Sequence, residues 1–328
     1  MQPHGHPLGR RAFLASLSSL FAATGFGRRR FRSPEVVLFS TVGYLIFRDY
    51  VRVADPANGQ ISPYLTPFGH RSYPDGSARS LQGPVAVVVH DKFDGQQLGD
   101  AIELYWPPGR WRRVWYRPPG TPGTLNISPD GGHIAAVFRP TPQDYQHIWI
   151  FSTGAEPEPL DVTDLWPATG RTGDFSPHWR PDSRAVLFHR VTVPPGGGYA
   201  TITIEQFELP TRRFTVARPP SIYNFDACYR PPGTLIVREY GAIRQVMANG
   251  EVRELLPYGA IPGFGFLDAG LAYSAPLNAV AFTVGETKLI GQPRQEQAIW
   301  LLWMADGRLQ KLVAVREARI SQLCFARP

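Results

Sequence analysis

The sequence predicts an all-β fold, a six-bladed β-propeller built from four-stranded antiparallel blades. A turn centred on proline precedes a short apolar strand four times, at Pro129, Pro181, Pro231 and Pro276, so the period is about fifty residues. Each unit then continues as a series of short strands joined by turns. One small sheet cannot bury both of its faces alone, so β-rich units of this period stack on copies of themselves, as in a propeller or a solenoid.

The unit around Pro181 contains the most complete set of predicted strands. We expect an inner strand at 174–179, a turn at 181–184, and further strands at 185–191, 200–207 and 213–218. The unit around Pro129 has the same order, with strands at 124–128, 133–139, 147–151 and 160–163. Four strands therefore make one blade.

Matching positions in these units predict how neighbouring blades pack. The apolar groups at 136–138, 187–188 and 281–282 recur in second strands and are expected to lie between blades. Trp149 and Trp300 recur in third strands, where large rings fill the space that widens away from the axis.

The blade count follows from the spacing of the units. Residues 36–66 and 81–116 supply two units beyond the four with a turn proline. Pro74, Asp75 and Gly76 echo the turn, but no apolar strand follows directly, so we count no seventh blade between 66 and 81.

The two ends of the chain complement each other. Residues 322–327 resemble an inner strand that stops at the turn proline, and residues 33–39 resemble the turn and second strand that should follow. We therefore expect the C-terminal strand to complete the first blade, which removes the exposed edges of an open stack of sheets.

The positive charge is concentrated at the N-terminus. The net charge is +7, and residues 1–33 hold six of the 34 basic residues and no acid. The remaining 28 basic residues face 27 acidic ones, so residues 34–328, which we assign to the propeller domain, are nearly neutral. A neutral body lacks the electrostatic footprint of a nucleic-acid-binding protein, so we expect no nucleic acid among the partners.

Residues 1–33 resemble a twin-arginine export signal. Arg10, Arg11, Phe13 and Leu14 stand in the characteristic order before a mildly apolar run that is too short to span a bilayer comfortably as a mature anchor. The resemblance implies a periplasmic or otherwise extracytoplasmic protein, with no stable membrane span once the signal is removed. A disordered basic tail on a cytoplasmic protein is the alternative.

The repeats themselves resemble the WD40-like (PD40) repeat of TolB-type six-bladed propellers. The resemblance rests on Ser-Pro-Asp-Gly at 128–131 followed by Ile-Ala-Ala-Val-Phe, and on Phe-Ser-Pro-His-Trp-Arg-Pro-Asp at 175–182. It covers most of residues 120–328, and the separate N-terminal domain of TolB has no counterpart. We expect Asp130 and Asp182 to be structural residues that cap their own turns.

The sequence contains no recognisable catalytic motif. Cys228 and Cys324 fall on inner strands of different units, too far apart for a disulfide, and no metal-ligand spacing surrounds them. We therefore expect free buried thiols, no cofactor and no metal. Polar residues of the inner strands are expected to face the mouth of the central channel, where propellers bind ligands; these are Asn126, Asp174, His178, Asn224, Asp226 and Gln322.

Two functions remain open at this point. The first is an exported, non-enzymatic and monomeric propeller that presents its channel mouth to a protein or envelope component. The second is an enzyme acting on acidic oligosaccharides, because some propellers with these repeats are oligogalacturonate lyases whose channel histidines hold a metal. His178 alone stands at a matching place, while His133 and His189 fall on second strands, and one histidine makes a poor metal site.

Overall fold

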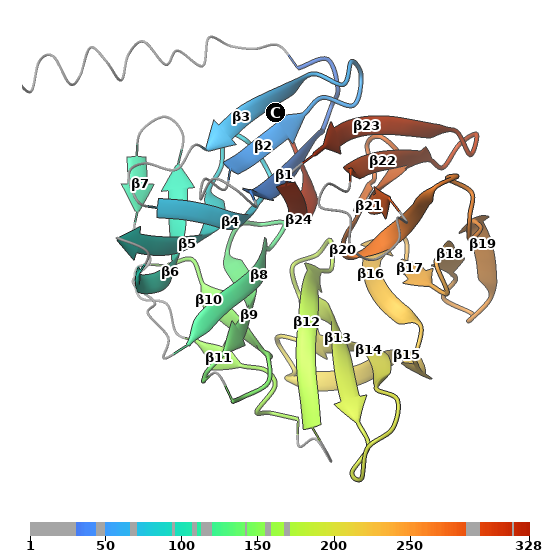
Figure 1. Ribbon diagram of the computed structural model, residues 1–328. Coiled ribbons are helices and arrows are strands. Elements are labelled where there is room, and N and C mark those ends of the chain that lie inside the picture. Colours follow the sequence, from blue (N-terminus) through green and yellow to red (C-terminus); the bar gives the residue numbers. More distant parts are fainter. Residues whose placement is uncertain are drawn as a thin grey trace, which may run out of the picture. The chain divides into compact units, whose positions relative to one another are not determined.

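The computed structural model describes residues 31–43, 50–65, 71–93, 96–106, 110–112, 120–141, 143–154, 159–166, 171–286, 296–316 and 318–328. Residues Ser33–Pro328 form one compact unit. Its described strands form six four-stranded sheets, and Figure 1 shows these sheets arranged around a common centre. The prediction of an all-β, six-bladed propeller is confirmed. Within the described ranges, the chain forms no helix with the length and apolar character needed to cross a bilayer.

The strands of each blade follow in order from the innermost to the outermost. Blade 1 contains β24 (Ala318–Ala326), β1 (Val36–Gly43), β2 (Tyr50–Ala54) and β3 (Ile61–Leu65). Blade 2 contains β4 (Arg71–Ala78), β5 (Val85–Phe93), β6 (Gln96–Trp106) and β7 (Arg110–Arg112). Blade 3 contains β8 (Thr121–Ile127), β9 (His133–Arg139), β10 (His147–Ser152) and β11 (Leu160–Asp161).

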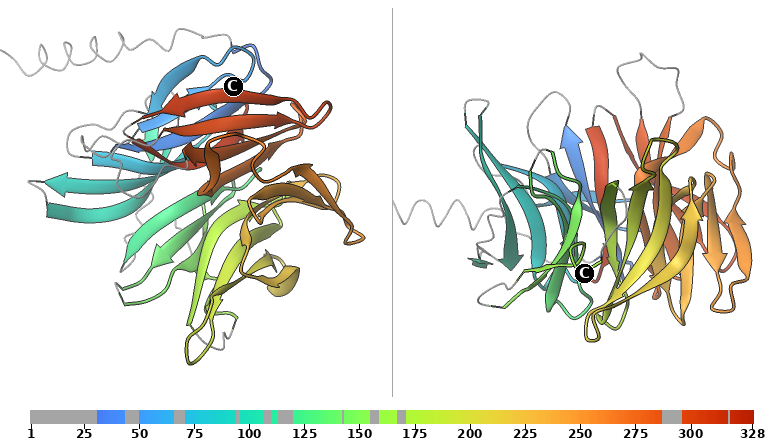
Figure 2. Two further views of the ribbon diagram at one scale, coloured as in Figure 1. Left: turned by 45° about the vertical axis from the view of Figure 1, so that its right-hand side comes forward. Right: turned by 90° about the horizontal axis from the view of Figure 1, so that it is seen from below.

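The other three blades repeat this order without interruption. Blade 4 contains β12 (Arg171–Trp179), β13 (Ala185–Val193), β14 (Thr201–Glu208) and β15 (Arg213–Ser221). Blade 5 contains β16 (Asn224–Arg230), β17 (Thr234–Glu239), β18 (Ala242–Val246) and β19 (Val252–Leu256). Blade 6 contains β20 (Phe264–Ser274), β21 (Ala279–Glu286), β22 (Gln297–Trp303) and β23 (Leu309–Val315). Figure 2 shows the sheets of neighbouring blades standing side by side.

The second strand of a blade is buried on both faces, which explains its unbroken apolar sequence. In β9, Ala136 and Phe138 pack against blade 2, whereas Ala135 and Val137 pack against blade 4. Successive side chains of a strand point to opposite faces, so each second strand contributes to two interfaces. Trp149 and Trp300 lie in the third strands β10 and β22 and pack on these cores, as the sequence predicts.

The C-terminal strand closes the ring as predicted. β24 pairs antiparallel with β1, with partners from Val36 and Ala326 to Gly43 and Ala318. Blade 1 is thus assembled from both ends of the compact unit. The end of the chain is also tied to blade 2, because the Arg327 backbone N–H donates to the Arg79 carbonyl over 2.9 Å.

The start of blade 2 differs from the sequence prediction. Pro74, Asp75 and Gly76 form no turn but lie within the inner strand β4, and Leu81 lies in the turn that follows it. The pairing of β4 with β5 shifts register between Ser72 and Asp75. A bulge of this kind tolerates proline within a strand, which disguises the inner strand in the sequence.

Candidate functional site

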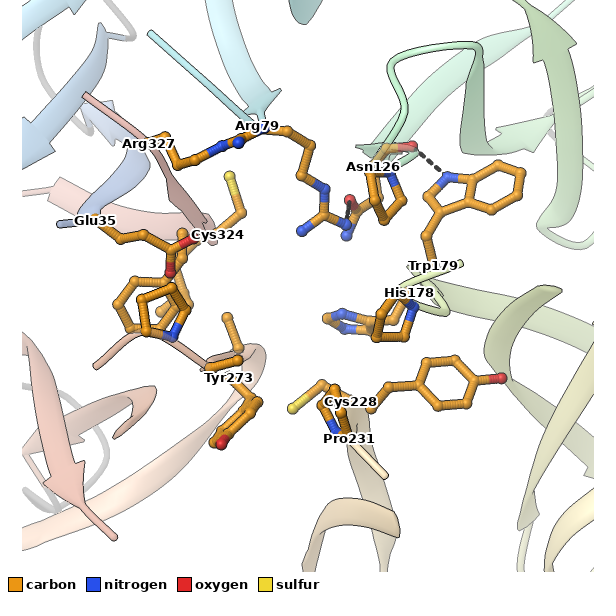
Figure 3. A pocket seen from close by; sticks show the side chains of 18 residues that line it. Glu35, Arg79, Asn126, His178, Trp179, Cys228, Pro231, Tyr273, Cys324 and Arg327 are labelled. Carbon is orange, nitrogen blue, oxygen red and sulfur yellow. Dashed lines mark hydrogen bonds between the residues drawn. The ribbon is translucent and has the colours of Figure 1, made fainter. Parts of the chain in front are cut away.

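The inner strands of all six blades end around one cavity on the propeller axis. The cavity has a volume of about 260 Å³ and is lined by residues from the ends of β8, β12, β16, β20 and β24 and by Arg79, which follows β4 (Figure 3). All four turn prolines, Pro129, Pro181, Pro231 and Pro276, line it. The turns that mark the repeat in the sequence therefore form the rim of this cavity, which we call the axial mouth.

Aromatic side chains make up much of the wall of the axial mouth, and hydrogen bonds hold their polar ends. Trp179 Nε1 donates to the Asn126 carbonyl over 2.9 Å, the Tyr229 hydroxyl donates to Gln206 Oε1 over 2.6 Å, and the Tyr273 hydroxyl donates to Asn278 Oδ1 over 3.1 Å. Rings held in this way offer apolar surface to a ligand at little cost in side-chain entropy.

Arg79 brings a positive charge to the axial mouth. Its Nε donates to the Ile127 carbonyl over 2.9 Å, and its Nη2 donates to Asn126 Oδ1 over 3.1 Å. Burial lowers the pKa of Arg79, and the nearby Cys324 and Glu35 act in the opposite direction. A guanidinium does not lose its proton in proteins, so the charge stays.

His178 and Asp226 form a polar contact in the floor of the axial mouth. His178 lines the cavity, and its Nε2 lies 3.3 Å from Asp226 Oδ1. Burial favours the protonated form of Asp226, but His178, His189 and Arg238 together hold the pKa of this carboxyl below its usual value. Asp226 is therefore a buried anion between neighbouring blades.

His189 approaches the same carboxylate from the second strand of blade 4. Its Nε2 lies 3.7 Å from Asp226 Oδ1. Burial lowers the pKa of His189 to about 4, against the opposing effect of Asp226. The ring is consequently neutral at neutral pH, so His189 adds no charge beside the cavity.

Both cysteines line the axial mouth as free, buried thiols. Burial raises the pKa of Cys228 well above its usual value, with a further contribution from Asp226. Burial also raises the pKa of Cys324. The thiolate is the nucleophile and the metal ligand, so neither side chain is activated for such chemistry at neutral pH.

The structure separates the predicted channel residues into two groups. Asn126 and His178 lie near the ends of β8 and β12 and line the axial mouth. Asp226 does not line the cavity but contacts His178. Asp174 lies within β12 and Asn224 at the start of β16, each farther from the rim than the lining residues of its strand, and neither lines the cavity. The predicted set is therefore brought together only in part.

Asp174 and Asn224 instead hold together neighbouring strands. Both oxygens of Asp174 accept from Arg190, each over 2.9 Å, and Arg190 also lies 3.2 Å from Glu205. The Asn224 amide donates to the carbonyls of Ile202 and Pro219, each over 3.0 Å. Gln322 reaches across from blade 1 to donate to the Leu125 carbonyl of blade 3.

The two turn aspartates accept hydrogen bonds from their own turns. Asp130 Oδ1 accepts from the Gly132 backbone over 2.9 Å and from the Ser128 hydroxyl over 2.5 Å. Asp182 Oδ1 accepts from the Arg184 backbone over 3.0 Å and from Arg180 Nε over 2.9 Å. The geometry of both turns is that of a side chain replacing a backbone acceptor.

Sequence reasoning missed Arg79. It lies in a blade whose inner strand carries no recognisable turn motif, so its place at the end of β4 could not be read from the repeat. The alignment of strand ends was the available signal. In blades 1, 2, 5 and 6 the residue directly after the inner strand lines the cavity, and these residues are Arg327, Arg79, Pro231 and Ala275.

The comparisons with known proteins identify the fold. No family model and no curated protein matches the sequence. Among solved structures, a putative TolB from Agrobacterium tumefaciens is 14% identical, with a TM-score of 0.56 over 86% of this chain and 90% of that one. TolB from Acinetobacter baumannii is 15% identical, with a TM-score of 0.59 over 98% of this chain and 74% of that one.

An oligogalacturonate lyase in complex with manganese is similar at the same level. It is 12% identical, with a TM-score of 0.51 over 85% of this chain and 73% of that one. At such low identities, these likenesses show a shared TolB-like propeller fold and leave the function to be argued from the site.

Proposed function

We propose that this chain is an exported, non-enzymatic propeller that binds a segment of a partner protein or envelope component at the axial mouth. The observation that carries the proposal is the composition of that cavity. Four turn prolines and several fixed aromatic rings surround a few polar groups, among them Arg79, His178 and Glu35. A concave apolar site with a small number of convergent polar groups is the usual form of a ligand-binding pocket.

Site-specific photo-crosslinking tests this proposal. Pro181 and Pro276 are exposed and line the mouth, so each is replaced by p-benzoylphenylalanine in the purified propeller. Val216, which is 58% exposed on the outer strand β15, is the matched control. After irradiation with an envelope extract, we expect the same adduct from both mouth positions and none from Val216. Equal labelling at Val216, or none at the mouth, would refute the proposal.

A second candidate is an enzyme that acts on acidic oligosaccharides. It is favoured by the two histidines that flank Asp226 beside the cavity. These residues do not fit a metal centre, because the charge of Arg238 acts on both Asp226 and His189. The described residues contain one group of three whose ligand atoms lie within 4.8 Å of one another, His147, Asp161 and Asp164, and it lies on blade 3 away from the mouth.

Metal content and product formation distinguish the two candidates. Under the leading proposal, the purified protein contains no stoichiometric metal and produces no unsaturated product from oligogalacturonate. Stoichiometric manganese together with activity that disappears in His178→Ala would establish the enzyme instead.

A further inference from the structure

The axial mouth holds a cation that is not paired with an anion. In the part of the chain that the structure describes, no carboxylate forms an ion pair with Arg79, whose hydrogen bonds go to a backbone carbonyl and to the Asn126 amide oxygen. Glu35, the acid among the described lining residues, accepts instead from the Ser274 hydroxyl over 2.6 Å. A guanidinium has five N–H donors, so these two bonds leave donors of Arg79 available.

The available donors face the cavity. Figure 3 shows the Arg79 guanidinium reaching from the rim toward the interior, on the side opposite Tyr273 and Cys228. Glu35 attracts the Arg79 charge but forms no direct ion pair with it, so an anion that enters the cavity can bind the guanidinium and stabilise a partly buried charge. The planar fork of arginine suits a carboxylate, which it binds through two parallel hydrogen bonds.

A hydrogen bond between blades 1 and 3 narrows the channel below the cavity. Gln322 comes two residues before Cys324 in β24, and Leu125 comes directly before Asn126 in β8. Cys324 and Asn126 line the cavity, so the hydrogen bond from Gln322 to the Leu125 carbonyl lies deeper than the cavity. The bond joins blades 1 and 3 across blade 2. Ser77 adds contacts there to Asn126, over 3.5 Å, and to Cys324, over 3.8 Å. These contacts narrow the channel below the mouth, and a cavity of about 260 Å³ suits the end of a chain.

We propose that Arg79 binds the C-terminal carboxylate of a peptide whose last residues enter the axial mouth between the turn prolines. This inference rests on the proposed function and specifies its ligand. Capture of a terminal carboxylate is an established mode of peptide recognition. The proline and aromatic walls favour apolar last residues in the peptide. A polyanion is disfavoured, because its row of negative charges would be repelled by Glu35 and Arg79 would neutralise only one of them.

Two synthetic peptide pools test the proposal. Both are heptapeptides with the last three positions randomised; one pool ends in a free carboxylate and the other in an amide. We expect the purified wild-type propeller to retain peptides from the acid pool at least tenfold better than from the amide pool. This comparison needs no variant, so it stands even where a substitution at Arg79 impairs folding.

Variants then assign the effect to Arg79. Arg79→Gln should abolish the preference for the acid pool, and Arg308→Gln, at a residue of blade 6 that lies away from the mouth, should retain it. The circular dichroism spectrum and melting temperature of each variant establish that it is folded.

Two further probes separate the competing outcomes. Retention of an amide pool with an internal glutamate, dependent on Arg79, would overturn the chain-end proposal in favour of a side-chain carboxylate. Binding of oligogalacturonate alone would overturn both this inference and the proposed function. Equal retention of the acid and amide pools, with crosslinking at Pro181 preserved, would overturn the inference and leave the proposed function standing.

Discussion

The aspartate at the second position of the repeat's turn stabilises that turn by accepting backbone hydrogen bonds. Asp182 accepts from the Arg184 backbone inside its own turn, and Asp130 does the same for Gly132. The Asp130 backbone N–H also donates to the Ser183 hydroxyl over 3.0 Å, which links the turns of blades 3 and 4. We therefore expect these aspartates to contribute to the stability of the rim rather than to ligand binding.

Replacement of Asp182 by alanine tests this role. Loss of one such hydrogen bond typically costs about 1 kcal/mol. For a domain of this size we expect a melting temperature lower by about 2 °C, with crosslinking at the mouth unchanged. Asp182→Asn keeps an acceptor oxygen and should melt close to the wild type. Wild-type stability combined with lost crosslinking in Asp182→Ala would assign the residue to the binding site instead.

His189 makes the stability of the propeller depend on pH. Burial lowers its pKa to about 4 from an ordinary value of 6.5, so the folded protein does not take up the proton that the unfolded chain binds below pH 6.5. Stability from this group is therefore complete above pH 6.5 and falls as the pH drops toward 4. By linkage, this one residue accounts for a loss of about 2 kcal/mol between pH 7.5 and pH 5.

Urea unfolding of His189→Gln at pH 7.5 and pH 5 measures this contribution. We expect the free energy of unfolding of the variant to fall less over this interval than that of the wild type. His147 provides a control of opposite sign, because its hydrogen bond to Asp161 raises its pKa. His147→Gln should make the decline steeper, and an identical pH dependence in all three proteins would contradict the assignment.

At the scale of elements, the closing strand has the greatest effect on the fold. β24 forms the inner edge of blade 1 and also contacts the inner strands of blades 2 and 6. Its apolar residues Leu323 and Phe325 belong to the core between blades 6 and 1. Without this strand, β1 presents an unpaired edge and that core is open.

Deletion of residues 320–328 should therefore yield an aggregating protein. A circular permutant is the matched control: it joins Pro328 to Ser33 and opens the chain at the exposed loop 194–200. This permutant keeps every strand of blade 1 and should stay monomeric, as judged by light scattering. A monomeric deletion variant with unaltered melting temperature would show that β24 is dispensable for closure.

At the scale of the whole molecule, the N-terminal segment has a proposed role in export that is separate from ligand binding by the propeller. Arg10 and Arg11 lie outside the described residues, and the export role of that segment is a proposal from its sequence. It is supported by the Arg-Arg-x-Phe-Leu order and by a basic segment that precedes a nearly neutral body.

Conversion of both Arg10 and Arg11 to lysine should leave the protein inside the cell. Lysine preserves the charge, so an ordinary secretion signal would tolerate the change, whereas a translocase that reads paired arginines would not. Cell fractionation with an antibody against the propeller gives the readout. Unimpeded export of the double variant excludes the twin-arginine route, and retention of the wild type excludes export altogether.

The sequence by itself determined the blades. Each predicted strand of blades 3 and 4 corresponds to an observed one, and residues 133–139 agree with β9 at both ends. These features are local: a proline turn, alternating side-chain directions and a buried apolar run are set by residues close together in the chain. The closing strand could also be predicted, because the two ends of the chain carry complementary parts of one repeat.

Only the tertiary structure decided which side chains meet on the axis. Arg79 and Asn126 come from neighbouring blades, His189 reaches Asp226 from a second strand, and Ser77 contacts Cys324 from 247 residues away. Asp174, predicted at the mouth, is instead paired with Arg190 inside its own blade. Such contacts depend on the angle and register at which closed blades face each other, and no local pattern in the chain specifies those.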